Sequence, residues 1–392
     1  MASLWTDRAA GSIRGPVTPG GRYDVVVAGA GLTGLVTALL LARGGLRVAV
    51  LEARRVGAGT TGHTTAKLSL LQGTRLSRIA RKQPQEMVQA YVDANNEGQS
   101  WLLRYCSTHR VDVQRRPAVT YATTEQGRRS LDSELEAARG CGLDVELVDS
   151  VDLPYPTLGA LRMDQQAQFD PMEVLTALVA DLERHDGSVF EQTRVQGVHH
   201  GDPLRVGTGH GDILADRLVL ATGTPVLDRG LYFARLEPLR SYALAFEVPE
   251  TAPLPAGMYL SADPPSRSVR TAPHGDGVRL LVGGNGHVVG RHGSTRALVE
   301  DLQTWTAQHF PGARMTHSWS AQDYESIDAL PYVGPLTPRN DRVLVATGYA
   351  KWGMTNAVAA GLALSGRILG SAAPWAQAMD SWRLREAAAA ST

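Results

Sequence analysis

Apolar and polar positions in the first 54 residues follow a pattern that changes period twice. Residues 23–28 form a valine-rich apolar run, which is typical of a strand buried in a parallel sheet. A helical pattern of apolar residues then continues through Leu41 and stops at Gly44 and Gly45, a common signal for a helix end. A second apolar run, residues 47–51, ends on Glu52. The pattern predicts a strand–helix–strand unit at the start of the chain.

Three glycines with the spacing G-x-G-x-x-G stand between the first strand and the helix. Gly29 permits a tight turn, Gly31 lets a pyrophosphate approach the backbone, and Gly34 lets the helix pack closely on the strand. The helix N-terminus offers free N–H groups to phosphates. Glu52 follows Gly31 by 21 residues, where a carboxylate can accept hydrogen bonds from ribose hydroxyls. The unit predicts a site for an ADP-containing dinucleotide; the alternative is a unit of this shape without a ligand.

Beyond residue 54, helical and strand-like patterns alternate. Helical patterns cover residues 73–108, 125–141, 171–184, 294–309 and 355–369, and strand patterns cover residues 111–123, 143–148, 188–197, 204–216, 217–225, 232–284 and 342–346. The strand-rich middle of the chain is typical of an antiparallel sheet. Residues 1–22 are rich in glycine and proline and are expected to form a loose lead-in. The predicted fold class is α/β combined with α+β, in which a Rossmann-type domain accompanies an antiparallel-sheet domain.

The composition excludes several classes of function. The 392 residues carry 39 basic and 39 acidic side chains, so no basic excess indicates nucleic acid binding. The two cysteines, Cys106 and Cys141, are not spaced for an iron–sulfur site or a dithiol pair. No metal site is expected, because the pair His199 and His200 reads as part of a hairpin turn. No apolar run reaches membrane-spanning length and no secretory signal is present, so we expect a cytoplasmic protein.

Lysine is unusually rare in this chain, since arginine outnumbers it 36 to 3. The three lysines are Lys67, Lys82 and Lys351. With such a bias, a lysine is less easily explained as an arbitrary surface cation. Lys67 and Lys351 both fall within stretches that we assign to a cofactor site below.

Two further stretches have the composition expected beside a cofactor. Residues 57–65 consist mainly of small and hydroxyl-bearing residues and are predicted to form a loop around the cofactor phosphates, with an ordinary surface turn as the alternative. The apolar strand 217–225 contains Ala221, Thr222 and Gly223, which let the chain pass close to a bound molecule.

Four separated stretches, residues 23–54, 57–67, 220–225 and 346–355, resemble the D-amino-acid-oxidase/glycine-oxidase (DAO) family of FAD enzymes. The chain is similar above all to the branch that usually carries a C-terminal Rieske domain. The shared words are SLW near the N-terminus, GHTTAKL (62–68), FARLEPLRSYALA (233–245), WSAQDYESIDALPYVG (319–334) and ATGYAKWGMTN. A Rieske domain is not expected here, because the sequence stops at residue 392 and two cysteines do not provide its two-Cys, two-His pattern.

The resemblance implies two interleaved domains and an FAD site. It assigns residues 20–75, 160–225 and 325–392 to the FAD domain, 76–159 and 226–324 to a substrate domain, and 1–19 to the lead-in. It implies a backbone contact from Val195 to the adenine end, and the helix starting at Thr355 would point at the flavin pyrimidine carbonyl. The implied FAD-binding residues are Gly29, Gly31, Leu32, Thr33, Gly34, Glu52, Ala53, Arg54, Thr61, Gly62, His63, Thr64, Thr65, Val195, Ala221, Thr222, Gly223, Gly348, Lys351, Trp352, Gly353, Met354 and Thr355.

The resemblance also suggests residues that contact the substrate. Lys351 matches a position where related amine oxidases carry a cation that holds the substrate carboxylate; a solvent-facing turn lysine is the alternative. Arg235 and Arg240 lie in the sheet predicted to roof the site, beside Tyr232 and Tyr242, and one of them is a candidate clamp for a carboxylate; a surface ion pair is the alternative. Strand alternation would place 232, 240 and 242 on one face and 235 on the other.

His63 matches a histidine that dimethylglycine- and sarcosine-dehydrogenase relatives bond covalently to FAD. Here the non-covalent alternative is favoured, with His63 lying beside the dimethylbenzene edge or the pyrophosphate.

The implied function is removal of a hydride from a C–N bond of an amine or amino-acid-like molecule, with electrons passing to O2. The alternatives are a dehydrogenase that passes electrons to a separate carrier protein, and a catalytically silent FAD-binding subunit. A pyridine-nucleotide monooxygenase or a disulfide reductase is disfavoured, because the other glycine cluster, residues 283–290, is not followed by a helix signal. Substrate identity, FAD linkage and oligomeric state stay open at this stage.

Overall fold

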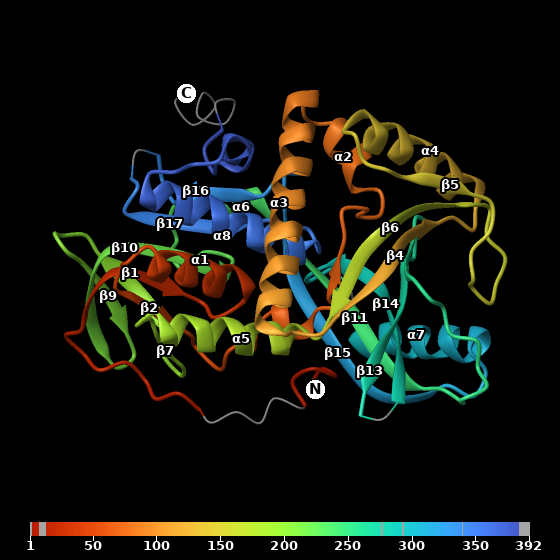
Figure 1. Ribbon diagram of the computed structural model, residues 1–392, viewed down its shortest axis with the longest axis horizontal. Helices are drawn as coiled ribbons and strands as arrows, with labels where there is room; N and C mark the ends of the chain where they lie inside the picture. The colour runs from red at the N-terminus through yellow and green to blue at the C-terminus, as the bar shows by residue number, and fades with distance from the viewer. Residues whose placement is uncertain (1, 8–12, 276, 292–293, 339, 384–392) are drawn as a thin grey trace.

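The protein folds into two lobes, each built around one β-sheet, and helix α3 (Gln85–His109) stands between them in Figure 1. The computed structural model describes residues 2–7, 13–275, 277–291, 294–338 and 340–383. The chain crosses between the lobes several times, so each sheet combines segments that are distant in sequence. The interleaving implied by the sequence is therefore confirmed, and the chain has the predicted combination of α/β and α+β structure.

The first sheet contains the predicted strand–helix–strand unit. In the described chain it consists of β1 (Arg22–Ala28), β2 (Val48–Leu51), β7 (Ser188–Phe190), β8 (Val195–His199), β9 (Leu204–Thr208), β10 (Gly211–Gly223), β16 (Tyr332–Pro335) and β17 (Val343–Thr347). The order is β16-β17-β10-β1-β2-β7, with β17, β10, β1, β2 and β7 parallel, while β9 pairs with β10 and β8 with β9. The carboxyl ends of the parallel strands meet at one edge, where such sheets bind their ligands.

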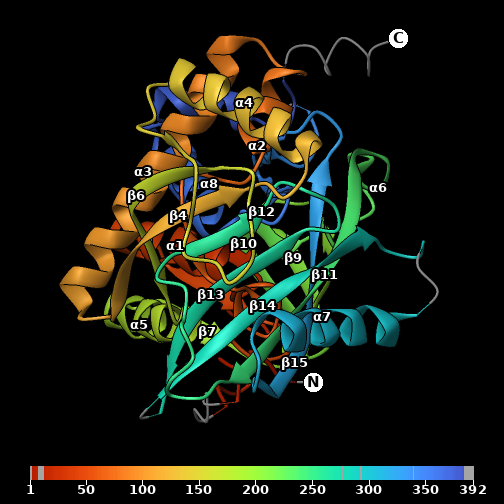
Figure 2. The same cartoon turned by 90° about the vertical axis from the view of Figure 1, so that its right-hand side faces the viewer.

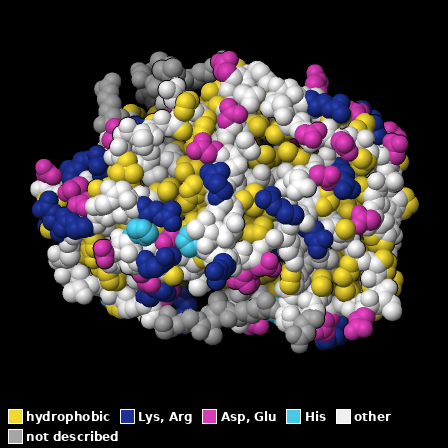
Figure 3. Space-filling view, viewed as in Figure 1, with side chains coloured by type: hydrophobic (Ala, Val, Ile, Leu, Met, Phe, Trp, Pro, Cys, Tyr) yellow, Lys and Arg dark blue, Asp and Glu magenta, His cyan; other side chains and the backbone are white. Residues whose placement is uncertain are grey.

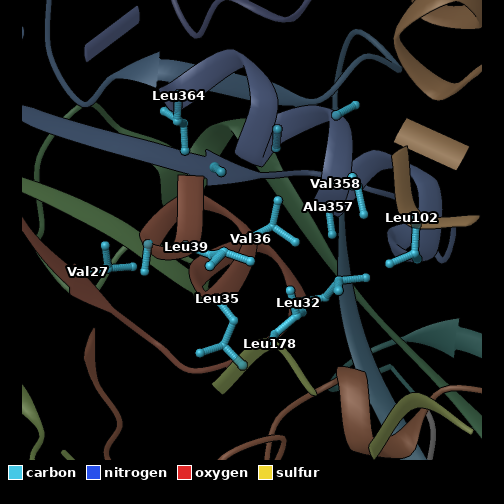
Figure 4. Close-up of a cluster of buried hydrophobic side chains, with 14 of the residues drawn as sticks. Val27, Leu32, Leu35, Val36, Leu39, Leu102, Leu178, Ala357, Val358 and Leu364 are labelled. Carbon is cyan, nitrogen blue, oxygen red and sulfur yellow. The ribbon is translucent and has the colours of Figure 1, made fainter. Parts of the chain in front are cut away.

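Helices pack an apolar core against the first sheet. They are α1 (Leu32–Arg43), α5 (Pro171–Arg184) and α8 (Gly353–Leu369), with the short η2 (Pro374–Met379) near the C-terminus. Figure 4 shows side chains of α1 meeting Leu178 of α5 and Val358 of α8. Ten of the twelve α1 residues are buried, and each buried leucine stabilises the fold by about 2 kcal/mol. This packing fixes the N-termini of α1 and α8 relative to the sheet edge.

The second sheet is mostly antiparallel. In the described chain it consists of β3 (Lys67–Leu68), β4 (Val113–Tyr121), β5 (Glu146–Val148), β6 (Ala160–Phe169), β11 (Leu236–Glu247), β12 (Met258–Ser261), β13 (Arg267–His274), β14 (Gly277–Val288) and β15 (Arg314–Ser326). The order is β15-β11-β14-β13-β12-β4-β6-β3, with β5 paired to β6. Helix α7 (Thr295–His309) covers one face of this sheet, as Figure 2 shows, and the remaining elements are α2 (Arg75–Ala80), α4 (Glu125–Gly140), α6 (Tyr232–Arg235) and η1 (Thr61–His63).

Several local predictions need correction. The helical pattern 73–108 divides into α2 and α3, because Pro84 stands as the extended N-cap of α3. The segment predicted as strand from residue 232 begins with the helix α6, so strand alternation does not relate Tyr232 to Arg240. The hairpin 204–216 and the strand 217–225 share one long strand, β10. Strand β6 falls in the range predicted for the FAD domain but belongs to the second sheet.

The predicted loose lead-in is wrong for residues 3–5, whereas residues 13–18 form neither helix nor strand. Ser3, Leu4 and Trp5 are 0%, 0% and 2% exposed, and they pack beside Trp319 of β15. Met1 and residues 8–12 lie outside the described residues. The short N-terminal segment therefore forms part of the core between the lobes.

Positive and negative side chains are interspersed over the face shown in Figure 3, in keeping with the zero formal net charge. Within the described ranges, no helix is both long and apolar enough to cross a bilayer. Nor do three or more His, Cys, Asp or Glu side chains of those ranges gather in a metal-binding arrangement.

Candidate active site

The glycine turn at the carboxyl end of β1 is shaped by two close backbone approaches. Gly29 has φ +103°, and a Cβ there would lie 2.5 Å from the carbonyl oxygen of Ala221 in β10. A Cβ on Gly34 would lie 1.9 Å from the carbonyl oxygen of Gly29. Both positions therefore exclude a side chain, as the sequence predicted for a tight turn and a close helix–strand contact.

The N-terminus of α1 is open in the way a phosphate site requires. Gly31 provides no capping side chain, and the first turn of α1 has no acidic residue. A Cβ on Gly31 would meet only Thr61 Oγ1, at 3.2 Å, and this hydroxyl accepts the N–H of Leu32 at 3.1 Å. Thr33 Oγ1 lies 2.9 Å from the hydroxyl of Tyr349. The helix dipole and free N–H groups are thus directed at one open spot beside Thr61.

The predicted adenosine end is assembled around Glu52. Its carboxylate accepts the N–H groups of Ala30 at 3.0 Å and Arg54 at 2.9 Å, which fixes it beside the glycine turn. The carbonyl oxygen of Glu52 accepts the N–H of Thr193, two residues before Val195. Segments far apart in sequence therefore meet beside Glu52, while the contact of Val195 with the adenine end stays a prediction.

Two tryptophans hold the loop that precedes β3. The indole N–H of Trp5 donates to the carbonyl oxygen of Thr64 at 2.7 Å, and that of Trp319 donates to the carbonyl oxygen of His63 at 2.9 Å. The His63 ring places Nδ1 2.8 Å from the carbonyl oxygen of Gly59. These contacts fix the loop backbone, while a covalent bond from His63 to a cofactor stays a prediction.

Replacing Trp5 or Trp319 by phenylalanine is expected to weaken FAD binding about fivefold, because each change removes one loop hydrogen bond of about 1 kcal/mol. Fluorescence titration of the apoprotein with FAD measures the effect. Trp382→Phe is a matched control, since its indole also donates to a backbone carbonyl, that of Pro335, away from this loop. Equal FAD affinity in all three variants would mean that the loop contacts play no part in binding.

A buried polar network lies below the first turn of α8. Thr355 Oγ1 donates to Asn95 Oδ1 at 2.5 Å and accepts from Gln72 Nε2 at 3.1 Å, and Tyr91 donates to Gln72 at 2.6 Å. Asn356 Nδ2 lies 3.1 Å from the Tyr91 hydroxyl. Thr355 was predicted from the sequence, but its partners were not. Tyr91 and Asn95 stand four residues apart on one helix, and this spacing could have indicated that they share a face.

Lys351 lies in a strained turn immediately before α8. Ala350 and Lys351 have φ +50° and +72°, a conformation that costs non-glycine residues about 1–3 kcal/mol each and clusters at functional sites. The half-buried carboxylate of Asp323 accepts the N–H of Lys351 at 2.5 Å, and the N–H of Tyr324 also donates to it. Burial raises the pKa of Asp323. Sequence analysis did not find Asp323.

The side chain of Lys351 is exposed to solvent, and its ammonium group lies beside Gly286 of β14. A Cβ on Gly286 of β14 would lie 2.1 Å from Lys351 Nζ, so this glycine leaves room for the ammonium group. Partial burial lowers the pKa of Lys351, while Asp323 and Glu325 oppose that shift. No carboxylate of the described chain lies within the 4.0 Å ion-pair distance of Nζ.

The other predicted substrate contacts are dispersed. The guanidinium of Arg240 donates to Gln322 Oε1 at 3.0 Å. The backbone carbonyl oxygen of Arg240 would lie 3.9 Å from a Cβ built on Gly286, the glycine that lies against Lys351 Nζ. Tyr242 is 5% exposed, within the core cluster that contacts α7. Tyr232 lies in the core of the first lobe, where the guanidinium of Arg235 stacks 4.9 Å from its ring. The structure therefore brings only Arg240 near Lys351.

The glycine turn, the open helix N-terminus and the second lobe facing the same sheet edge define a dinucleotide-dependent oxidoreductase of the flavoprotein type. The chain belongs to the DAO family, described as FAD dependent oxidoreductase, whose pattern matches residues 24–367.

Individual relatives agree with this assignment. The chain is 31% identical to the Rieske 2Fe-2S iron-sulfur protein YhfW of Bacillus subtilis over 87% of this chain and 68% of that protein. It is 24% identical to γ-glutamylputrescine oxidoreductase of Escherichia coli over 89% and 84% of the two chains. Glycine oxidase from Geobacillus kaustophilus shares the fold with a TM-score of 0.74 at 20% identity, covering 90% of this chain and 96% of that one.

FAD is the cofactor of this family, and the residues present fit it. Gly29, Gly31 and the α1 N-terminus would hold the pyrophosphate, Glu52 the ribose, and the first turn of α8 the ring system. Bound FAD supplies the two-electron redox chemistry. The chain itself would position FAD through the glycine turn and the N-termini of α1 and α8.

Proposed function

We propose that the protein oxidises a C–N bond of a small amine or amino acid that carries a carboxylate. The observation that supports this proposal is Lys351, an accessible cation in a strained turn at the start of α8. Its neighbours Asp323 and Glu325 favour the charged form without reaching ion-pair distance. The ammonium group is thus available to a ligand carboxylate, and Arg240, whose backbone carbonyl lies beside Gly286, is a second predicted cation on the same sheet.

In this proposal the second sheet covers the substrate while Lys351 fixes its carboxylate. A fixed carboxylate holds the carbon–nitrogen bond in one orientation, and such positioning lowers the barrier of a bimolecular step. Glycine oxidase, L-proline dehydrogenase and γ-glutamylputrescine oxidoreductase among the similar proteins have names consistent with this substrate class.

We favour O2 as the electron acceptor, because the positive charge of Lys351 would stabilise negative charge that develops near the cofactor. The Rieske protein among the relatives supports the second candidate, a dehydrogenase that passes electrons to a carrier protein.

The test begins with acid precipitation of the purified yellow protein. FAD in the supernatant would exclude the covalent bond to His63, whereas flavin that stays with the pellet would support it.

The substrate class is tested on the intact holoenzyme. Glycine, L-proline and γ-glutamylputrescine are added separately without oxygen, and bleaching of the flavin absorbance is expected with at least one of them. Oxygen uptake compared with reduction of dichlorophenolindophenol separates oxidase from dehydrogenase. Bleaching by dithionite but by no amine or amino acid would contradict the proposal and favour a silent FAD-binding subunit.

A further inference from the structure

Lys67, at the start of β3, is a second lysine at the interface of the lobes that the proposed function does not use. Its Nζ donates to the carbonyl oxygen of Tyr259 at 2.7 Å and to the hydroxyl of Ser268. The side chain of Lys67 is half-buried.

The sheet register places this amine beside the cofactor loop. Leu260, Ser268 and Gly283 are direct neighbours across β12, β13 and β14, so they share one face. A Cβ on Gly283 would lie 3.6 Å from Ser268 Cβ and 3.9 Å from Thr65 Cγ2. On the same face of the sheet, the Leu260 side chain lies against Gly73, and a Cβ built on Gly73 would lie 3.9 Å from the Trp352 ring. Because Lys67 bonds to Ser268, its amine lies on this face, which is directed toward the first lobe and the turn before α8.

The hydrogen bonds of Lys67 match a neutral amine. A neutral lysine has two N–H groups and one lone pair, whereas an ammonium group has three N–H groups. The two acceptors, Tyr259 and Ser268, use both N–H groups, and no third acceptor of the described chain lies within hydrogen-bond distance. No carboxylate of the described chain lies within 4.0 Å of Nζ. A charged Lys67 would be a half-buried cation without a counter-ion, which is unfavourable.

The groups around Lys67 act in the same direction. The guanidinium of Arg270 on β13, which donates to the carbonyl oxygen of Ala66 at 2.9 Å, repels a second positive charge. From the other packed elements, β6 presents Gln168 and β12 the carbonyl oxygen of Tyr259, which are neutral. Burial, followed by Arg270, lowers the pKa of Lys67 to about 7. Lys351 differs, because two carboxylates there favour the charged form.

We propose that Nζ of Lys67 is the acceptor of the proton that leaves the substrate nitrogen, an inference that rests on the proposed function. Amines and amino acids are ammonium ions near neutral pH, and the nitrogen lone pair must be free before the adjacent carbon can lose a hydride. In this step one N–H bond of the substrate breaks, a bond from that proton to Nζ forms, and the electron pair remains on the substrate nitrogen. Neither partner is oxidised or reduced. One lysine then anchors the carboxylate, and the other acts as the general base.

The protonation state can be measured directly because the chain has three lysines. Holoenzyme labelled with 13C at lysine Cε should give three titratable signals, and one of them should titrate with a midpoint near pH 7. This signal should be absent from Lys67→Met and present in Lys82→Met and Lys351→Met. If every lysine signal keeps its ammonium shift up to pH 9, the proposal is wrong.

The catalytic role is tested by anaerobic flavin reduction with the amino acid that bleaches the wild type fastest among glycine, L-proline and γ-glutamylputrescine. Below pH 7 the wild-type rate should rise about tenfold per pH unit, because only the neutral amine accepts a proton. Lys67→Met should react about 100-fold more slowly and lose this rise. Lys82→Met is the matched control, since its Nζ also donates to a backbone carbonyl, that of Ile327, on the surface.

The variant Lys67→Arg distinguishes two roles of Lys67. One is that of a base that accepts a proton, and the other is that of a fixed positive charge that binds an anion. Arginine stays charged at these pH values, so Lys67→Arg should be as slow as Lys67→Met if Lys67 is a base. Wild-type rates in Lys67→Arg, or an unchanged pH profile in Lys67→Met, would overturn the proposal and leave the proposed function intact. If no panel member reduces the flavin of the wild type, the proposed function fails, and the proposal with it.

Discussion

Replacing Lys351 by methionine is expected to lower kcat/KM about 100-fold while FAD remains bound. Methionine keeps most of the side-chain volume but removes the charge that would pair with the substrate carboxylate. Removal of one partner from a desolvated, hydrogen-bonded charge pair costs about 3 kcal/mol, which corresponds to roughly two orders of magnitude. The measurement is anaerobic flavin reduction by the preferred amino acid over a range of concentrations.

Two comparisons make this result specific. With the decarboxylated analogue, methylamine for glycine or pyrrolidine for proline, wild type and Lys351→Met should react equally slowly. Gly286→Ala should lower kcat/KM without unfolding the protein, because the added Cβ would displace only the flexible end of Lys351. Gly277→Ala lies on the same strand, with its nearest contact at 3.8 Å, and should behave as wild type. A Lys351→Met enzyme that keeps the wild-type KM would show that the carboxylate binds elsewhere.

Replacing Gly34 by alanine is expected to abolish FAD binding. The substitution removes no special backbone conformation, and alanine favours a helix over glycine by about 1 kcal/mol. The new Cβ, however, would lie 1.9 Å from the carbonyl oxygen of Gly29, where no real Cβ atom fits. Since both groups belong to the backbone, α1 must move away from the glycine turn, at a cost of about 1–3 kcal/mol or more. The clash outweighs the gain in helix propensity and opens the phosphate site.

The ratio of flavin absorbance to protein absorbance after purification measures the loss, and titration of the apoprotein gives the affinity. Gly140→Ala is the control, because a Cβ on this residue of helix α4 would have its nearest contact at 3.8 Å and the residue has no positive φ. A Gly34→Ala protein with full FAD content would show that the observed helix–turn contact is not required.

The strand–helix–strand unit and its glycine turn could be predicted closely because their signals are local. Gly29, Gly31 and Gly34 lie within six consecutive residues, and β1, α1 and β2 follow them at short range. Hydrophobic period and glycine spacing report such structure directly. The same reasoning failed at Tyr232–Arg235, because so short a run fits both the helix period and the strand period. In the structure the guanidinium carbon of Arg235 lies 4.1 Å from the centre of the Tyr332 ring, and Tyr332 is nearly 100 residues away in the sequence.

The surroundings of Lys351 were predicted less completely, because they depend on contacts between distant segments. Lys351 was found by resemblance, but Asp323 and Gly286, which position it, have no local signature. The docking of Trp5 against Thr64 was likewise invisible, because the partners stand 59 residues apart and the N-terminal sequence is rich in turn-forming residues.

The sequence by itself determined the family, the cofactor and the order of the local elements, because glycine positions and hydrophobic periodicity act within one or two turns of the chain. Only the tertiary structure decided which side chains share the interface of the lobes. The two lysines there have opposite surroundings: carboxylates near Lys351, and a guanidinium with neutral acceptors near Lys67. Electrostatic environment depends on distance in space and on exclusion of water, and neither can be read from spacing along the chain.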